Sequence, residues 1–384
     1  MKKEPFLYTI SFVIDAGFGV VGIAVPLLAL QLGATYDELG LIGAVSFLVY
    51  SLGSVVSGRL SERLGYRRTM IVASSLAVPM VLLFNFASTV IQILLLSGII
   101  RLSLAGLWPP MQAWLGSGKD RSELLNTLGR YNVCWGLGIL VGPLAGGALY
   151  SLGTATPFVF VSSLMGLISI VLILLKVRDE NADEPSPGQP QHQANARQFL
   201  PIAWSANFAG FFSAGAIRAL FPKVTSDLGI SSDILGLLLS LIGVAQVFVF
   251  YVVSRNNHWE FKFAPLVAVQ ILAACGLLLL VFADTTLAFA CSMLCLGVAL
   301  GITFTASIFY SLLSGGGGRR TGIHESIIGS GYFLGPLAGG VAAQHIGSRA
   351  PYLLAAVVIF IVVLLQTYLH QGISKSELSC QPGD

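Results

Sequence analysis

The sequence predicts an all-helical membrane protein with twelve spanning helices, arranged as two pseudo-symmetric bundles of six. Three observations predict this fold class. Of the 384 residues, 55% are hydrophobic and only 10% are charged, whereas soluble globular chains carry roughly 25% charged residues. Apolar runs of about 20 residues, long enough to cross a bilayer, recur along the chain. Short sequence patterns of the first half return in the second half.

The apolar runs are separated by short polar breaks. One long polar stretch, 178–198, divides them, and its Pro, Gln and acidic residues cannot build a core. We therefore expect an N-terminal six-helix bundle over 1–177, a cytoplasmic linker over 178–198 and a C-terminal six-helix bundle over 199–384. The expected helices lie near 6–30, 38–58, 68–87, 90–113, 124–150, 155–177, 199–222, 232–254, 262–282, 286–312, 321–346 and 350–370.

Two pairs of segments indicate that the halves are repeats. Residues 142–147 and 335–340 both read GPLAGG, and Pro143 and Pro336 are 193 residues apart. The pattern LGAT…LGL at 32–41 returns as LGIS…LGL at 228–237, a shift of 196 residues that also places Pro26 on Pro222. Two parallel repeats are one plan of secondary transporters, with the binding site between the repeats near the membrane midplane.

Basic residues predict the orientation. The loops of one side hold only Lys223 and Arg349. Because the side richer in Lys and Arg faces the cytoplasm, we expect a multi-pass protein of the cell (inner) membrane with both termini cytoplasmic. The predicted cytoplasmic side carries Lys2, Lys3, Arg59, Arg63, Arg67, Arg68, Lys119, Arg121, Lys176, Arg178, Arg197, Arg255, Lys262, Arg319, Arg320 and Lys375.

Several functional classes lack a sequence signal. The basic residues lie in short loops between apolar runs, so no nucleic acid is expected as a partner. The five cysteines show neither a disulfide framework nor metal-ligand spacing, and we expect no metal and no cofactor. The glycine run at 315–318 lacks the Lys-Ser/Thr ending of a phosphate loop. No Ser-His-Asp or paired-carboxylate arrangement argues for an enzyme.

Residues 58–68, GRLSERLGYRR, lie between the second and third runs. They resemble the loop signature of the major facilitator superfamily, G-x-L-a-D-r-x-G-r-[KR]. Gly58, Glu62, Arg63, Gly65 and Arg67 occupy matching positions, with Glu62 in place of the usual Asp. The resemblance implies a monomeric transporter that alternates access by rocking its two halves. The matching segment of the second half, 254–262, has lost the glycines and the acid of the signature.

The fifth run contains a second motif. Its segment 138–147, GILVGPLAGG, resembles the motif of drug:proton antiporters in that superfamily, with Gly142 and Pro143 at its centre. Glycines four residues apart form a flat strip on one helix face, and a proline adds a bend. The alternative is ordinary tight packing, and the copy in the eleventh run, at Gly335 and Pro336, strengthens that alternative.

Placing a charged side chain inside an apolar run costs free energy, so each such residue is expected to have a structural or functional role. Arg101 begins the segment RLSLAG, which resembles a superfamily pattern whose arginine is associated with proton coupling, although the glutamine before the glycine is missing. At about 1.5 Å per residue, Asp15 and Arg101 lie about 14 and 18 Å from the cytoplasmic boundary, and Arg130 about 9 Å. We hypothesise that Asp15 titrates with Arg101 as its electrostatic partner, because separating such a pair changes the proton affinity of the carboxyl group. A static buried ion pair is the alternative.

His324 and Glu325 lie about one turn inside the eleventh helix. They predict either a cytoplasmic gate or cap, or a proton relay. Under the shift of 193 residues they fall on Tyr131 and Asn132 of the fifth run. Arg218 lies near the outer boundary, where it can reach the interface or bind an anionic substrate. The candidate substrate-binding residues are Arg130, Tyr131, Asn132, Trp135 and Arg218.

Taken together, these features predict a secondary active transporter that moves a small organic solute by alternating access, through proton-coupled efflux. Its expected partners are a small-molecule substrate, the lipid bilayer and protons. A facilitator or importer of a small anion is one alternative. A non-transporting sensor or scaffold built on the same fold is the other.

Overall fold

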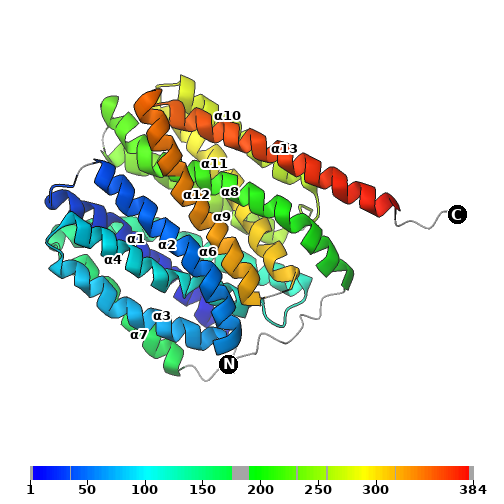
Figure 1. Ribbon diagram of the computed structural model, residues 1–384, viewed down its shortest axis with the longest axis horizontal. Coiled ribbons are helices and arrows are strands. Elements are labelled where there is room, and N and C mark those ends of the chain that lie inside the picture. Colours follow the sequence, from blue (N-terminus) through cyan, green and yellow to red (C-terminus); the bar gives the residue numbers. More distant parts are fainter. Residues whose placement is uncertain are drawn as a thin grey trace. The chain divides into compact units, whose positions relative to one another are not determined.

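The structure is a computed structural model that describes residues 3–34, 36–174, 190–230, 232–256, 258–315 and 317–379. Within these ranges every regular element is a helix (Figure 1). Twelve stretches of the described chain are long and apolar enough to cross a membrane. The predicted all-helical fold class with twelve spans is therefore confirmed.

The helices before the grey segment of Figure 1 are α1 (Glu4–Gln31), α2 (Tyr36–Leu64), α3 (Tyr66–Leu82) with the short 3₁₀ helix η1 (Leu83–Phe86), α4 (Val90–Ala105), α5 (Trp108–Gly116), α6 (Arg121–Leu152) and α7 (Thr156–Leu174). Those after it are α8 (Pro190–Asp227), α9 (Ser232–Arg255), α10 (Phe263–Phe282), α11 (Thr286–Leu313), α12 (Gly317–His345) and α13 (Ala350–Ser379).

One predicted span consists of two helices. α4 ends at Ala105 and α5 begins at Trp108, with Pro109 and Pro110 in its first turn. Prolines have no backbone N–H to donate, so they cannot continue the hydrogen bonding of α4, but they fit the first turn of a new helix. Val90–Gly116 still forms a single candidate span.

The turn between α2 and α3 is tighter than predicted. The sequence suggested that α2 ends near residue 58 and that a loop follows, but α2 continues to Leu64. The expected loop is wrong because polar residues at the end of a span do not need to leave the helix where it enters water. The chain reverses at Gly65, whose φ of 93° favours glycine.

α8 begins nine residues before the predicted start at 199, at Pro190. The rest of the predicted linker, 178–189, lies outside the described residues. In this early part Ala196 is fully buried, and Arg197 Nε donates to the carbonyl oxygen of Ser314 at 3.0 Å. The ring of Phe199 lies 5.9 Å from that of Tyr310. Tertiary contacts therefore extend the helix into a polar segment. The boundaries of the two bundles stay a prediction.

The chain forms two compact units. Unit 1 comprises Met1–Pro187 and Gly315–Phe333, and unit 2 comprises Gly188–Ser314 and Leu334–Asp384. In unit 1, α1 packs along α6, α2 along α4, and α3 along α7. In unit 2, α11 packs against α8, α9 and α10, and α13 packs against α8 and α10. The first part of α12 thus belongs to unit 1 and its last part to unit 2.

The GPLAGG segments make equivalent contacts in the two units. A Cβ atom at Gly142 of α6 would lie 2.6 Å from the carbonyl oxygen of Ala16 in α1. A Cβ atom at Gly335 of α12 would overlap the carbonyl oxygen of Phe212 in α8. Small residues let membrane helices approach this closely. The sequence repeat is therefore also a repeat of helix packing.

Candidate functional site

The first part of α12 packs closely against α2 within unit 1. A Cβ atom at Gly58 of α2 would overlap the carbonyl oxygen of Gly318 and lie 2.9 Å from the Cα atom of Gly322. On the α5 side, the hydroxyl of Thr321 donates to the carbonyl oxygen of Pro109 at 2.8 Å. These contacts fix the α12 segment between α2 and α5. One turn later they bring Glu325 into the interior of the unit.

Further contacts with α2 follow along the same segment. The hydroxyl of Ser51 donates to the carbonyl oxygen of Ser326 at 2.8 Å. It also lies 2.9 Å from the hydroxyl oxygens of both Ser326 and Ser330. α12 is therefore held by a hydrogen bond to α5 before Glu325 in the sequence and by hydrogen bonds to α2 after it.

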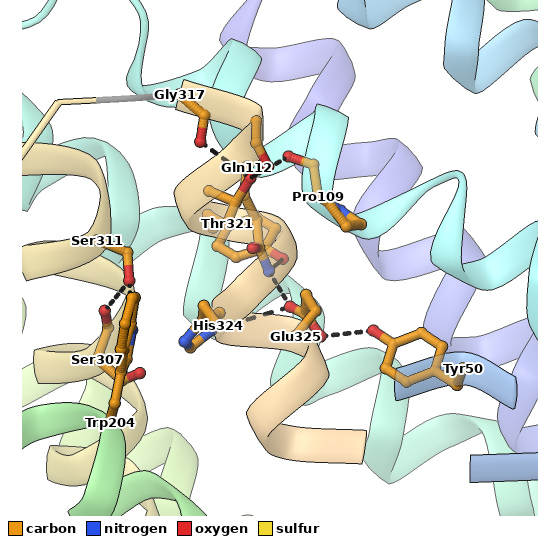
Figure 2. Close-up of polar contacts among 12 residues, drawn as sticks. Tyr50, Pro109, Gln112, Trp204, Ser307, Ser311, Gly317, Thr321, His324 and Glu325 are labelled. Atoms are coloured by element: carbon orange, nitrogen blue, oxygen red, sulfur yellow. Dashed lines mark hydrogen bonds and ion pairs between the residues drawn. The ribbon is translucent and has the colours of Figure 1, made fainter. Parts of the chain in front are cut away.

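Glu325 is the centre of a buried polar group, the Glu325 cluster, formed with Tyr50, Gln112, Tyr131 and His324. Tyr50 of α2 donates its hydroxyl to Glu325 Oε2 at 2.5 Å, and Gln112 of α5 donates its Nε2 to Oε1. The same Nε2 atom lies 3.1 Å from the hydroxyl oxygen of Tyr131 in α6. His324 Nε2 lies 3.8 Å from Glu325 Oε1. In Figure 2, Tyr50 and Gln112 approach the carboxyl group from two directions.

The cluster is suited to hold either form of a carboxyl group. Glu325 is 5% exposed, Gln112 1% and Tyr131 0%. An ionised carboxylate this far from water needs hydrogen bonds to both oxygens, and Tyr50 and Gln112 supply one to each. A protonated carboxyl group needs an acceptor instead, and the tyrosine hydroxyl can reverse its role and accept. The arrangement can therefore hydrogen-bond the carboxyl group in both its ionised and its protonated form.

Asp15 and Arg101 lie in the same unit, on α1 and α4. Asp15 is half-buried beside α6, where a Cβ atom at Gly138 would lie 2.8 Å from the Cβ atom of Asp15. The guanidinium of Arg101 lies over the ring of Phe47 in α2, 4.3 Å from its centroid. The charge of Asp15 acts on Arg101. The structure thus brings the two residues within electrostatic range, and their role in proton coupling stays a prediction.

The other candidate binding residues are placed differently. Arg130 is exposed on α6 and its charge acts on Tyr8 of α1. Asn132, two residues further along the same helix, is fully buried, and Trp135 is half-buried. Arg218 belongs to α8 of unit 2 and is exposed. Within unit 1, only Tyr131 of the proposed binding residues joins the Glu325 cluster through a described hydrogen bond.

Residues 7–316 match the profile of the Major Facilitator Superfamily. The chain belongs to this superfamily. The match extends from within α1 to the end of α11 and includes the whole signature at 58–68. The resemblance predicted from that signature is therefore confirmed. The chain is a multi-pass membrane transporter with the fold of the superfamily.

Similar proteins align with this chain over nearly their full length. The multidrug resistance protein MdtG of Serratia proteamaculans (strain 568) is 26% identical over 386 residues, which cover 93% of this chain and 91% of that protein. The human organic anion transporter MFSD10 (TETRAN) has a TM-score of 0.76 at 14% identity, covering 95% of this chain and 100% of that one. The fucose:proton symporter of Escherichia coli has a TM-score of 0.69 at 16% identity, covering 95% and 98%.

In this superfamily member the signature residues contact the ends of other helices. Glu62 Oε1 accepts the backbone N–H of Arg319 at 2.6 Å, at the N-terminus of α12, where a negative charge is stabilised by the helix dipole. Arg67 donates from Nε to the carbonyl oxygen of Leu172 at 2.7 Å, and from its terminal nitrogen to that of Ile173 at 2.8 Å. These carbonyl groups lie in the last turn of α7. Arg63 is exposed.

Sequence reasoning missed two members of the cluster, Tyr50 and Gln112. Both lie in apolar spans and belong to no recognised motif. Gln112 carried a usable signal, because it is the lone strongly polar side chain of the run LWPPMQAWL at 107–115. A primary amide in such a run is expensive unless it is hydrogen-bonded. Tyr50 carried no comparable signal, since tyrosines are common at membrane interfaces and in helix packing.

Proposed function

We propose that this superfamily member exports small organic solutes in exchange for protons, and that Glu325 takes up and releases the proton. The observation that carries the proposal is a carboxyl group buried among hydrogen-bond donors from α2 and α5. The MdtG relative is a multidrug resistance protein, which supports efflux of organic solutes. The fucose:proton symporter supports the coupling, because it is a protein with this fold that moves its solute together with protons.

Proton binding at Glu325 changes the links between helices. The ionised carboxylate accepts from Tyr50 and Gln112 and so ties the first part of α12 to α2 and α5. Hydrogen bonds to an ionised acceptor are roughly twice as strong as neutral ones. Protonation removes that charge and weakens both links. A proton therefore shifts the equilibrium between conformations in which α12 is held in unit 1 and those in which it is released.

Asp15 is the second candidate for the proton-binding group. It is half-buried and lies within the field of Arg101, so its charge already has a partner of opposite sign. Glu325 accepts hydrogen bonds from Tyr50 and Gln112. Among the described residues it forms no ion pair with Lys or Arg, and its carboxyl group lies 3.8 Å from Nε2 of His324. We assign the coupling proton to Glu325, with His324 as the neighbouring group that can pass it on.

We also propose the orientation, the membrane and the oligomeric state of the chain. We place both termini on the cytoplasmic side, because the basic residues gather in the loops of that side. We further propose that the chain is a monomer of the cell (inner) membrane. The linked ends of α2, α7 and α12, where Glu62 and Arg67 bind, then lie toward the cytoplasm.

The test uses the full-length chain in proteoliposomes that contain a pH-sensitive dye. Three probes that share one ring system and differ in charge are added outside: the anion naphthalene-sulfonate, the neutral naphthalene-sulfonamide and the cation trimethyl-naphthyl-ammonium. Internal pH is followed for wild type, Glu325→Gln and Asp15→Asn. Glu123→Gln is the matched control, since Glu123 is an exposed acid in the first turn of α6. Protein-free liposomes report passive leak.

At least one probe is expected to drive a proton flux in wild type and in Glu123→Gln, and none in Glu325→Gln. If Glu325→Gln keeps the wild-type flux while Asp15→Asn loses it, the coupling proton belongs to Asp15 and our assignment fails. If a probe enters wild-type liposomes with no proton flux, the chain is a facilitator and the coupling proposal fails entirely.

A further inference from the structure

Arg101 is stacked rather than hydrogen-bonded. Its guanidinium carbon lies 4.3 Å from the centroid of the Phe47 ring. The ring of Tyr332 stacks on Phe47 with centroids 4.7 Å apart and an interplanar angle of 27°. The three side chains come from α4, α2 and α12, and all belong to unit 1. Each is half-buried, so part of each remains accessible.

The accessible part of Arg101 does not belong to the apolar outer face of its helix. The exposed apolar residues of α4 lie at Ile91, Leu95, Ile99 and Leu102, a spacing that defines one stripe. At about 100° per residue, Arg101 lies about 120° around the helix from Leu95. Phe47 is likewise about 140° from the exposed Leu52 of α2. Both side chains therefore face away from the surfaces that suit lipid.

The hydrogen-bond donors of Arg101 have no acceptor in the part of the chain that the structure describes. An arginine carries five N–H donors and stays charged in proteins. Other half-buried arginines use theirs: Arg67 donates to two carbonyl groups, and Arg349 donates to a carbonyl group and to Asp284. The opposite charge that acts on Arg101 is that of Asp15, without a described hydrogen bond between them. A charged donor group inside a membrane protein marks a functional site.

We propose that Arg101 binds the anionic group of the transported solute, and that the solutes of this chain are aromatic or otherwise amphipathic organic anions. The planar guanidinium binds an oxyanion through two parallel N–H bonds. Phe47 and Tyr332 hold the guanidinium in place and offer apolar ring surface beside the charge. The inference rests on the proposed function only in that the chain moves small organic solutes. It does not depend on Glu325.

One consequence concerns the charge moved in each cycle. A monovalent anion leaving the cell in exchange for one entering proton carries two charges in the same electrical direction. An inside-negative membrane potential and an inward proton gradient then both drive export.

The test measures binding, not transport, on the full-length chain in detergent without a pH gradient. Isothermal titration gives Kd for naphthalene-sulfonate and for its neutral isostere, naphthalene-sulfonamide. The variants are Arg101→Gln, Arg101→Lys and the control Arg255→Gln. Arg255 is matched because it also stacks over a ring, 4.4 Å from the centroid of Tyr251, but is exposed. Thermal unfolding followed by tryptophan fluorescence confirms that each variant is folded.

We expect wild type to bind the sulfonate at least about tenfold more tightly than the sulfonamide, the factor expected for a charge-assisted hydrogen bond. Arg101→Gln removes the preference, Arg101→Lys keeps part of it, and Arg255→Gln leaves it unchanged. Equal affinities in wild type, no binding of the sulfonate, or a preference that survives in folded Arg101→Gln would each overturn the inference. Equal affinities and absent sulfonate binding are measured on wild type alone, so they do not depend on whether the variants fold.

Failure of this inference can be told from failure of the proposed function. A chain that prefers the sulfonate but moves no protons has the anion site and lacks the coupling. A chain that exchanges protons for the sulfonamide or the ammonium probe, without preferring the sulfonate, has the coupling and lacks the anion site.

Discussion

Tyr50 of α2 donates a hydrogen bond of 2.5 Å to the Oε2 atom of Glu325 in α12, across 275 residues of sequence. The bond joins two helices from different halves of the sequence within one compact unit. It depends on the protonation of Glu325, because the hydroxyl donates to an ionised carboxylate and can accept from a protonated one. The state of one proton is thus linked to the contact between α2 and α12.

Replacing Tyr50 with phenylalanine removes one donor to the ionised form of Glu325. The protonated form then persists to higher pH. We expect the midpoint of the pH profile of probe-driven proton flux to rise by about one pH unit, since a hydrogen bond to a charged group contributes about 1.5–3 kcal/mol and one unit corresponds to about 1.4 kcal/mol. Tyr368→Phe, at a residue 75% exposed, is the control. An unchanged midpoint in Tyr50→Phe would show that the hydrogen bond from Tyr50 to Glu325 does not affect proton-coupled transport.

A methyl group at Gly58 is expected to destabilise the protein. Its Cβ atom would overlap Gly318 of α12, and overpacking of a tight contact costs about 1–3 kcal/mol. Gly22→Ala is the matched control, because a Cβ atom there meets nothing within 4 Å. It should be neutral or stabilising by up to about 1 kcal/mol. Thermal unfolding of the two variants in detergent checks this, and equal unfolding temperatures would contradict the described packing.

Asp15→Asn tells whether Asp15 acts on Arg101 only through its charge or also holds Arg101 in its binding position. If Asp15 only acts on Arg101 through its charge, removing that charge strengthens binding of naphthalene-sulfonate and leaves binding of the sulfonamide unchanged. Titration calorimetry of both probes measures the difference. The proton flux of the variant should persist. Weaker sulfonate binding in Asp15→Asn would mean that Asp15 holds Arg101 in its binding position.

Transport of the sulfonate probe should respond to voltage. A potential set by potassium and valinomycin, negative on the side from which the anion leaves, is expected to accelerate its movement. Each elementary charge that crosses 100 mV gains about 2.3 kcal/mol. The sulfonamide should respond less, since only the proton is then charged. Equal responses of the two probes would show that the solute's charge does not cross the membrane with it.

The fold was predictable because its signals are local or repeated. Each apolar run of spanning length predicts a helix without knowledge of its neighbours, and the shared GPLAGG segments predict a shared packing. Gly142 against α1 and Gly335 against α8 show that packing in both units. Helix ends were less predictable, as α8 shows. Its polar start is held by contacts of Arg197 and Phe199 with distant residues.

The candidate site was only partly predictable. Glu325 and His324 stand out as polar residues in a span, and Asp15 and Arg101 as charges. Tyr50 and Gln112 lie 275 and 213 residues from Glu325, and no local pattern encodes a pairing over such distances. Phe47 and Tyr332, which position Arg101, look like ordinary apolar and aromatic residues. Their role depends on which faces α2, α4 and α12 turn toward one another.

The proposed link between proton movement and solute movement depends on Glu325. Two modes of transport, compared in proteoliposomes with wild type and Glu325→Gln, test this link. One mode is accumulation of labelled naphthalene-sulfonate driven by a pH gradient, and the other is exchange of labelled for unlabelled probe without a gradient. We expect wild type to show both modes and Glu325→Gln to keep exchange but lose gradient-driven accumulation. Gradient-driven accumulation in Glu325→Gln at the level of wild type would contradict the role of Glu325.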